Sequence, residues 1–142
     1  MKEIFYEGAI PSELIADSIN KHASKTEIGA HQIFLGQVRG DVINNAKVVG
    51  IEYTSYEPLA LEKMHQIREE VIQKYDLTCM HVLHSLGFVK VGELCLFVFT
   101  SSSHRAAATS ACAETVERIK AELPIWGKEI LEDLSYQWKK NG

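Results

Sequence analysis

The stretch TCMHVLHSLGFVKVGELCLFVFT, residues 78–100, carries the clearest signal of a β-sheet in this chain. Thr78 to Leu86 and Glu93 to Thr100 are apolar runs of strand length, and the segment from Gly87 to Gly92 separates them. Two such runs joined by a short segment that contains glycine predict a β-hairpin. Because a hairpin pairs its strands antiparallel, this stretch favours a mostly antiparallel sheet over a doubly wound one.

The sequence on either side of the hairpin predicts further strands and several helices. Runs rich in β-branched and aromatic residues predict strands over Ile28–Val38 and Val48–Tyr56, and a short first strand is expected over Glu3–Glu7. Helical spacing of apolar residues predicts helices over Ile10–Ala23, where Pro11 and Ser12 are start signals, and over Pro58–Lys74. An alanine-rich interior that ends at Pro124 predicts a helix over Ser103–Leu123, and a short final helix is expected over Lys128–Lys139. This order predicts an α+β fold, a mostly antiparallel sheet with packed helices, and one domain over residues 1–142.

Composition and charge argue against several classes of protein. The chain has 15 basic and 19 acidic residues, so no overall positive field recommends nucleic acid or an anionic membrane as a partner. No apolar run reaches the roughly 18 residues of a membrane span, and the N-terminus lacks the apolar core of a signal peptide. Cys79, Cys95 and Cys112 form no CxxC pair, and we interpret them as small buried apolar groups. We therefore expect a cytoplasmic protein.

Two segments place a cationic side chain beside a strand or helix end. In TSSSHRAAAT, residues 100–109, a strand runs into a helix start, where unpaired N–H groups together with His104 and Arg105 could bind an anion. The simpler alternative is that one of the serines only caps the helix. In FLGQVRGD, residues 34–41, Arg39 ends a strand beside a glycine and could grip a phosphate, or it could be a solvated arginine before a turn.

A third segment, IKAELPIWGKEI, residues 119–130, sets two lysines on either side of a corner built from Pro124 and Trp126. Lys120 and Lys128 near an apolar wall could serve proton transfer or covalent catalysis, although lysines near a helix C-terminus are also ordinary partners of the helix dipole. The six histidines are scattered along the chain, and we expect no metal site. From the residues alone, three cationic segments could converge on an anionic ligand.

Five segments taken together resemble the large catalytic subunit of molybdopterin synthase, in this order and at this spacing. They are GAHQIFLGQVRGD (29–41), IEYTSYEPLALEKM (51–64), HSLGFVKVGE (84–93), TSSSHRAAATSAC (100–112) and RIKAELPIWGKE (118–129). The resemblance implies an α/β-hammerhead type fold and a cytosolic enzyme of molybdenum cofactor synthesis. It implies a central homodimer of large subunits within a heterotetramer, with a small ubiquitin-like sulfur-carrier subunit bound at each end.

The same resemblance implies the reaction. The carrier's C-terminal Gly-Gly, as a thiocarboxylate, gives up its sulfur in the large subunit's pocket. Two such transfers convert cyclic pyranopterin monophosphate (precursor Z) into the dithiolene of molybdopterin. No metal and no other cofactor are expected for this step, because molybdenum enters later.

Residue by residue, the resemblance implies a set of site residues. Lys120 matches the family's central catalytic lysine, and Lys128 is a second candidate catalytic lysine. The residues expected to bind substrate or the carrier terminus are Phe34, Gln37 and Val38 through their backbone, Arg39, His104, Arg105, Gly127 and Glu129.

Two departures from the family pattern bear on these roles. Gly127 stands where the family usually has a second functional lysine, and Ser85 follows His84 where the family often has arginine. Either Lys128 reaches the pocket in place of the missing lysine, or the protein works with one catalytic lysine fewer. A carrier-binding homologue with reduced or no turnover remains an alternative, as does an unrelated domain that binds a phosphate ligand.

Overall fold

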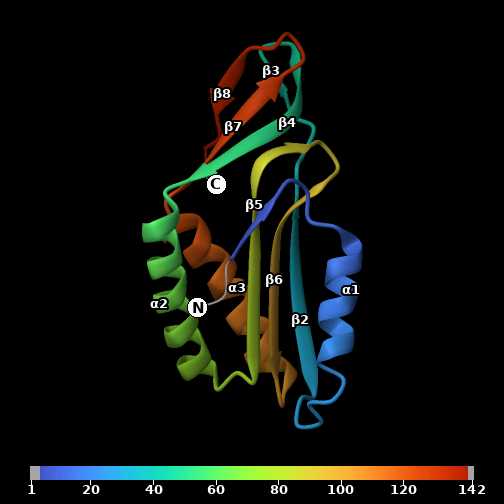
Figure 1. Ribbon diagram of the computed structural model, residues 1–142, viewed down its shortest axis with the longest axis vertical. Coiled ribbons are helices and arrows are strands. Elements are labelled where there is room, and N and C mark those ends of the chain that lie inside the picture. The colour runs from blue at the N-terminus through green and yellow to red at the C-terminus, as the bar shows by residue number, and fades with distance from the viewer. Residues whose placement is uncertain (1–3, 141–142) are drawn as a thin grey trace.

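The hairpin of residues 78–100 lies in the middle of the sheet. The structure, a computed structural model, describes residues 4–140. Its elements are β1 (Phe5–Glu7), α1 (Ser12–Lys21), β2 (Ala30–Gln37), β3 (Val42–Ile43), β4 (Ala46–Ser55), α2 (Glu57–Tyr75), β5 (Cys79–Lys90), β6 (Leu94–Ser102), α3 (Arg105–Glu122), β7 (Ile125–Leu131) and β8 (Tyr136–Trp138). The eight-stranded sheet has the order β2-β6-β5-β4-β7-β8, with β1 beside β5 and β3 beside β4 (Figure 1).

The predicted hairpin is confirmed, but its first strand is longer than expected. β5 continues through Gly87 to Lys90, so the turn occupies only the three residues before β6. The first half of β5 pairs with β6, whereas its second half, from Gly87 onward, pairs with β4. Gly87 has φ +80°, a conformation that glycine adopts at little cost, and it lies where β5 changes neighbours.

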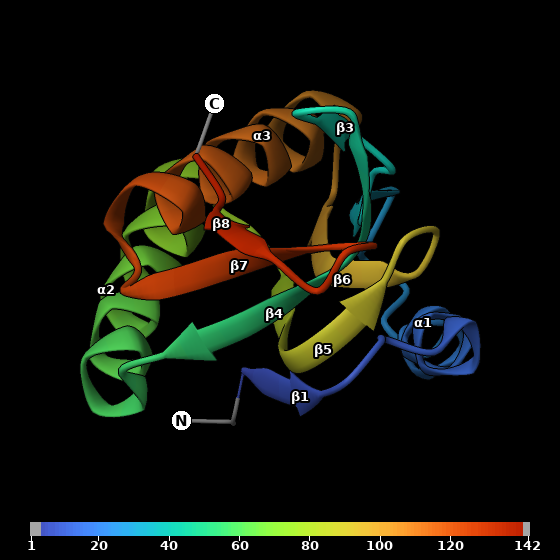
Figure 2. The ribbon, with the colours of Figure 1, turned by 90° about the horizontal axis from the view of Figure 1, so that it is seen from above.

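Alternation along β6 divides the core into two layers. Leu96 and Val98 pack toward α2 and α3, within the larger cluster of buried residues. Phe97 and Phe99 face the other way and form a second cluster with Ile10 and residues of α1. Figure 2 accordingly shows α2 and α3 on one side of the sheet and α1 on the other.

The α+β prediction is confirmed, because every pair of neighbouring strands is antiparallel except β1 with β5. The first strand is present over Phe5–Glu7, while Glu3 of the predicted range lies outside the described residues. The three cysteines are free and buried, as expected. Within residues 4–140, no helix is long and apolar enough to cross a membrane.

The final helix predicted over Lys128–Lys139 is wrong, since this segment forms β7 and β8. β4 pairs with β5 along one side, and the N–H and C=O groups along its other side need partners. β7 supplies these partners from Ile125 to Leu131. Short polar runs fit either period, so only this long-range pairing selects the strand. The turn-like segment before β4 also holds the short strand β3, which closes on β4 through Asn44 and Asn45 at φ +52° and +66°.

Candidate active site

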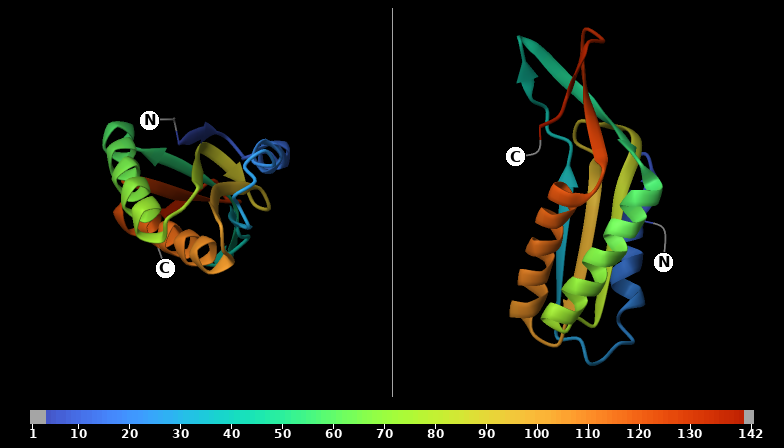
Figure 3. Two further views of the ribbon diagram at one scale, coloured as in Figure 1. Left: turned by 90° about the horizontal axis from the view of Figure 1, so that it is seen from below. Right: turned by 90° about the vertical axis from the view of Figure 1, so that its left-hand side faces the viewer.

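A pocket of about 300 Å³ opens where the C-terminal end of α3 meets the sheet. Its wall combines the end of β2, the middle of β4 and β7, the middle of β5, the start of β6 and the residue after β8. Figure 3 shows this junction between the upper end of α3 and the projecting strands. The polar residues of the wall are Gln37, Arg39, Asp41, Tyr53, His84, Cys95, Lys120, Glu129 and Lys139.

The register of β4 against β7 sets which side chains face the pocket. Tyr53 pairs with Gly127 and Ile51 pairs with Glu129, and all four residues line the pocket. A Cβ atom at Gly127 would lie only 3.0 Å from Ile51 Cγ2 and 3.2 Å from Tyr53 Cε1. The strand therefore approaches this wall closely, and glycine at this position leaves the space in front of it to other side chains.

Positive charge exceeds negative charge on the pocket wall. Arg39, Lys120 and Lys139 are the cations, against the carboxylates of Asp41 and Glu129. Arg39 Nε and Nη2 donate to the two oxygens of Asp41 at 2.7 and 3.2 Å, and this partner raises the pKa of the arginine. The guanidinium is thereby oriented while its outer face stays exposed, a geometry suited to an anion such as phosphate.

The pocket also shifts the pKa values of three of its side chains. Burial, together with the charge of Lys120, lowers the pKa of the Lys139 ammonium. Burial lowers the pKa of His84 to about 4, and the charges of Lys120 and Lys139 act in the same direction against a hydrogen bond to the Ser85 carbonyl. Burial, followed by the interaction with Cys95, raises the pKa of Tyr53. At neutral pH the imidazole and the phenol are thus neutral.

Five of the predicted site residues line this pocket. They are Gln37, Arg39, Lys120, Gly127 and Glu129, and they come from segments far apart in the sequence. Lys120 lies in the last turn of α3, and Glu129 is a buried carboxylate on β7.

The other predicted substrate-binding residues lie elsewhere. Val38 is buried in the larger core cluster, and Phe34 packs against it and lines a shallow groove between β2 and α3. His104 and Arg105 begin α3, so the helical rise puts them about 22 to 24 Å from Lys120. These two residues cannot contact the same small ligand as Lys120 within one chain.

Lys128 does not line the pocket. Its neighbours in the strand face inward, so alternation turns its side chain to the opposite face of the sheet. There its ammonium lies 4.0 Å from Glu52 Oε1 and 4.5 and 5.4 Å from the ring centres of Tyr136 and Trp138. The structure thus shows where Lys128 lies, and this is away from Arg39 and Lys120.

Three pocket residues, Tyr53, His84 and Lys139, were not among the predicted site residues. Lys139 is the most informative, because its backbone N–H donates to the Gly127 carbonyl at 2.8 Å. Had residues 125–139 been recognised as two strands, alternation would have placed Lys139 on the face of Gly127 and away from Lys128. Tyr53 and His84 stand in two of the five family segments, but nothing in those segments marked their side chains as site residues.

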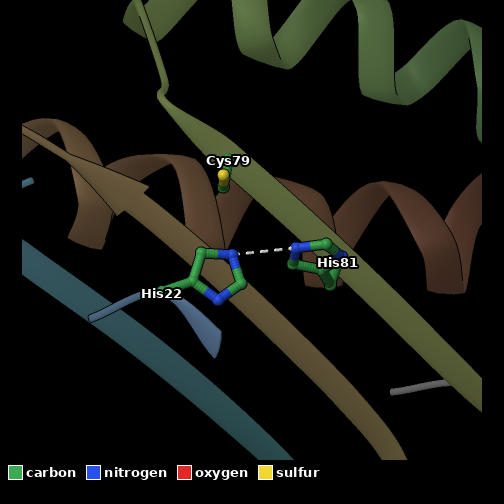
Figure 4. A group of neighbouring side chains, drawn as sticks. All are labelled: His22, Cys79 and His81. Atoms are coloured by element: carbon green, nitrogen blue, oxygen red, sulfur yellow. Dashed lines mark hydrogen bonds between the residues drawn. The ribbon is translucent and has the colours of Figure 1, made fainter. Parts of the chain in front are cut away.

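A second cluster of chemically active side chains lies at the opposite end of β5. His22 Nε2 and His81 Nε2 are 3.1 Å apart, and Cys79 Sγ lies within 4.8 Å of both (Figure 4). His22 and His81 are far apart in the sequence, and the fold brings them together. These three side chains are the described residues that could hold a metal ion.

Comparison with known proteins places the chain in a family. A model of the MoaE protein family matches residues 10–122. The molybdopterin synthase catalytic subunit of Bacillus subtilis (strain 168) is 38% identical over 122 residues, which cover 86% of this chain and 76% of that protein. The crystal structure of molybdopterin synthase from Staphylococcus aureus matches with a TM-score of 0.81 at 30% identity, over 99% of this chain and 100% of that chain.

A complex of subunits 1 and 2 of molybdopterin-converting factor from Helicobacter pylori 26695 has the same fold, with a TM-score of 0.80 at 20% identity over 98% of this chain and 92% of that chain. Fold and pocket define an α+β protein with a cation-rich pocket at the end of a long helix. The family match and the 38% identity show that this chain belongs to the MoaE protein family, whose curated relatives are catalytic subunits of molybdopterin synthase.

Proposed function

We propose that this chain is the large subunit of a molybdopterin synthase, and that the pocket beside Lys120 transfers sulfur to cyclic pyranopterin monophosphate. The observation that carries the proposal is the convergence of Arg39, Lys120 and Lys139 on one pocket in a chain of this family. A phosphorylated pterin and a carrier thiocarboxylate are both anions, so a pocket with excess positive charge suits them. The three free cysteines fit a reducing compartment, and we place the protein in the cytoplasm.

Each sulfur transfer must balance atoms and protons. The thiocarboxylate sulfur forms a bond to a substrate carbon, and the C–O bond at that carbon breaks. Water then cleaves the resulting thioester, which leaves a thiolate on the substrate, a carboxylate on the carrier, the departed oxygen as a hydroxyl, and one released proton. Two such events occur on neighbouring carbons, one of which is at the ketone oxidation level and also loses a second oxygen as water. That loss forms the C=C bond of the dithiolene without an oxidant or reductant.

The pocket residues divide this chemistry among them. Lys120 donates the proton that the leaving oxygen requires and stabilises the anionic intermediate of thioester cleavage. Arg39, held by Asp41, binds the substrate phosphate, and Gln37 supplies a further polar contact at the end of β2. Glu129 lies within the same pocket, where its carboxylate balances part of the positive charge.

His104 and Arg105 lie too far from Lys120 to serve the pocket of their own chain. The homodimer that we propose resolves this, because a neighbouring subunit can bring its own α3 start to the pocket. The small carrier subunit with its C-terminal Gly-Gly is the further partner, and it must reach Lys120 from the open side of the pocket. The complex of two subunits formed by the Helicobacter pylori relative supports such an assembly.

Reconstitution tests the proposal. Purified chain, thiocarboxylated carrier and precursor Z should yield molybdopterin, and Lys120→Ala should reduce the rate by at least about 100-fold while carrier binding persists. An intact chain that binds the carrier but forms no product would instead establish the alternative, a carrier-binding homologue without turnover. Failure to bind the carrier at all would contradict both.

A further inference from the structure

The pocket contains a second lysine, although this chain has Gly127 at the position where the family usually has one. We propose that Lys139, which follows β8, is the second catalytic lysine of this protein and takes over the role of the lysine absent at Gly127. The inference rests on the proposed function and names a further residue of the same site.

Geometry relates the two positions directly. Lys139 donates its backbone N–H to the Gly127 carbonyl at 2.8 Å, so the two residues are neighbours across the β7–β8 pair. A Cβ atom at Gly127 would lie 3.5 Å from Lys139 Cβ, which is ordinary van der Waals contact. The stem of Lys139 therefore starts beside the point from which a side chain at 127 would start, and it enters the same pocket.

The electrostatic setting of Lys139 suits proton transfer. Its side chain is half-buried between the strands and the end of α3, and the Lys120 charge acts on it. Arg39, in the loop after β2, lowers the pKa of the ammonium further, whereas Cys95 on β6 and Glu129 on β7 raise it, and the net shift is downward. Desolvation and a neighbouring cation are the two factors that make a lysine a competent acid and base near neutral pH.

The alternative residue, Lys128, lacks all of these features. It faces away from the pocket, and its ammonium contacts the Glu52 carboxylate and the rings of Tyr136 and Trp138. Lys140, next to Lys139 in sequence, is exposed. Lys128 and Lys140 are matched controls for Lys139. Each carries the same charge close to Lys139 in the chain, but its side chain lies outside the pocket.

Lys139→Ala should lower the turnover of precursor Z by about 100-fold, with KM for the carrier changed little. Lys128→Ala and Lys140→Ala should stay within about twofold of the wild type, as expected of surface changes. Gly127→Lys combined with Lys139→Ala should recover part of the lost activity, since the new stem begins at the neighbouring position once Ile51 and Tyr53 shift by a few tenths of an ångström to admit its Cβ. Circular dichroism of each variant shows whether the fold is retained.

Three outcomes separate the possibilities. Loss of turnover in Lys139→Ala with rescue by Gly127→Lys establishes the role of Lys139. Wild-type activity in Lys139→Ala refutes it and leaves the proposed function standing. An inactive wild-type chain refutes the proposed function, irrespective of Lys139.

The cluster at the other end of β5 supports a second, independent inference. We infer that His22, Cys79 and His81 form a binding site for one Zn²⁺ ion. Cys79 lies about 17 Å along β5 from His84, so this site is separate from the pocket. Cys79 and His81 are two residues apart on one strand and share a face, and His22 reaches them from the end of α1.

The spacing of the two nitrogens fits a tetrahedral ion, and the sulfur and a fourth, open position would complete its coordination. With Zn–N bonds of about 2.0–2.1 Å, two nitrogens of a tetrahedral site are about 3.3 Å apart, close to the 3.1 Å between the two Nε2 atoms. His22 Nδ1 lies 2.6 Å from the Ser18 carbonyl, so it carries the proton and its Nε2 keeps a lone pair toward His81. Lys25 donates to Cys79 Sγ at 2.7 Å, an outer contact that orients the sulfur.

The ligand set is largely buried, and a cavity gives an ion access to it. His22 and Cys79 are buried, and His81 lines a cavity of about 380 Å³ between α1, α2 and β5. Binding releases the Cys79 thiol proton, because the thiolate is the form that coordinates.

Co²⁺ reports on such a site through its spectrum. The chelator-treated chain should bind one Co²⁺, with visible bands of tetrahedral geometry and a sulfur-to-cobalt charge-transfer band, and Zn²⁺ should displace it. Cys79→Ser should abolish the charge-transfer band, and His22→Gln should weaken binding by more than about tenfold. Cys112→Ser, at a buried thiol on α3, should keep the full spectrum. A wild-type chain without these bands at equimolar metal, or a Cys79→Ser variant that retains them, overturns the inference.

Discussion

Burial of a single titratable side chain in the pocket makes the unfolding free energy depend on pH, and His84 is the clearest case. Burial lowers its folded-state pKa from 6.5 to about 4, so between these values the unfolded chain binds a proton that the folded chain does not. This contribution therefore makes the protein less stable as the pH falls from 6.5 to 4, by about 1 kcal/mol per pH unit. We expect His84→Gln to flatten the dependence of the unfolding free energy on pH in this window, measured by urea unfolding. An unchanged slope in His84→Gln would contradict the assignment.

At the level of elements, the β7–β8 hairpin holds Lys139 in place, and its turn is under strain. Leu134 has φ +69° and is 86% exposed. Its left-handed conformation costs free energy that burial of the side chain does not offset. Leu134→Gly should relieve that strain and raise the unfolding free energy by up to about 1 kcal/mol, after the entropy that glycine adds to the unfolded chain. Leu134→Val, which is β-branched, should lower it. The midpoints of urea unfolding measure both, and equal midpoints for the two variants would contradict strain in this turn.

For the whole molecule, the separation of Arg105 from Lys120 along α3 predicts active sites shared between subunits. Lys120→Ala and Arg105→Ala should each be inactive alone, whereas mixed dimers should contain one intact pocket. Random mixing makes half of the dimers mixed, and each has one working pocket of two, so co-expression should restore about a quarter of wild-type turnover. Absence of any recovery, with mixed dimers demonstrated by mass spectrometry, would place the function of both residues within one chain or outside the reaction.

Local sequence was sufficient for most elements of this fold. The hairpin of residues 78–100, the long helices before and after it, and the break at Pro124 follow from side-chain periodicity and from proline geometry, which act over a few residues. The five family segments likewise identified Lys120, Arg39 and Glu129, because these residues stand within contiguous patterns. Lys120 and Arg39 do line one pocket.

Long-range pairing supplied what local sequence could not. The residues after Pro124 form strands because β4 offers an unpaired edge to β7, and β7 then pairs with β8. Side chains alternate between the two faces along these strands, so Lys128 faces away from the pocket and Lys139 faces into it. The length of α3 separated Arg105 from Lys120, and the approach of α1 to β5 brought His22 to Cys79 and His81. The sequence thus determined the elements up to Pro124, apart from the short β3, and the family, because their signals are local. Tertiary structure determined which cations share the pocket, since facing direction depends on register and partners distant in the chain.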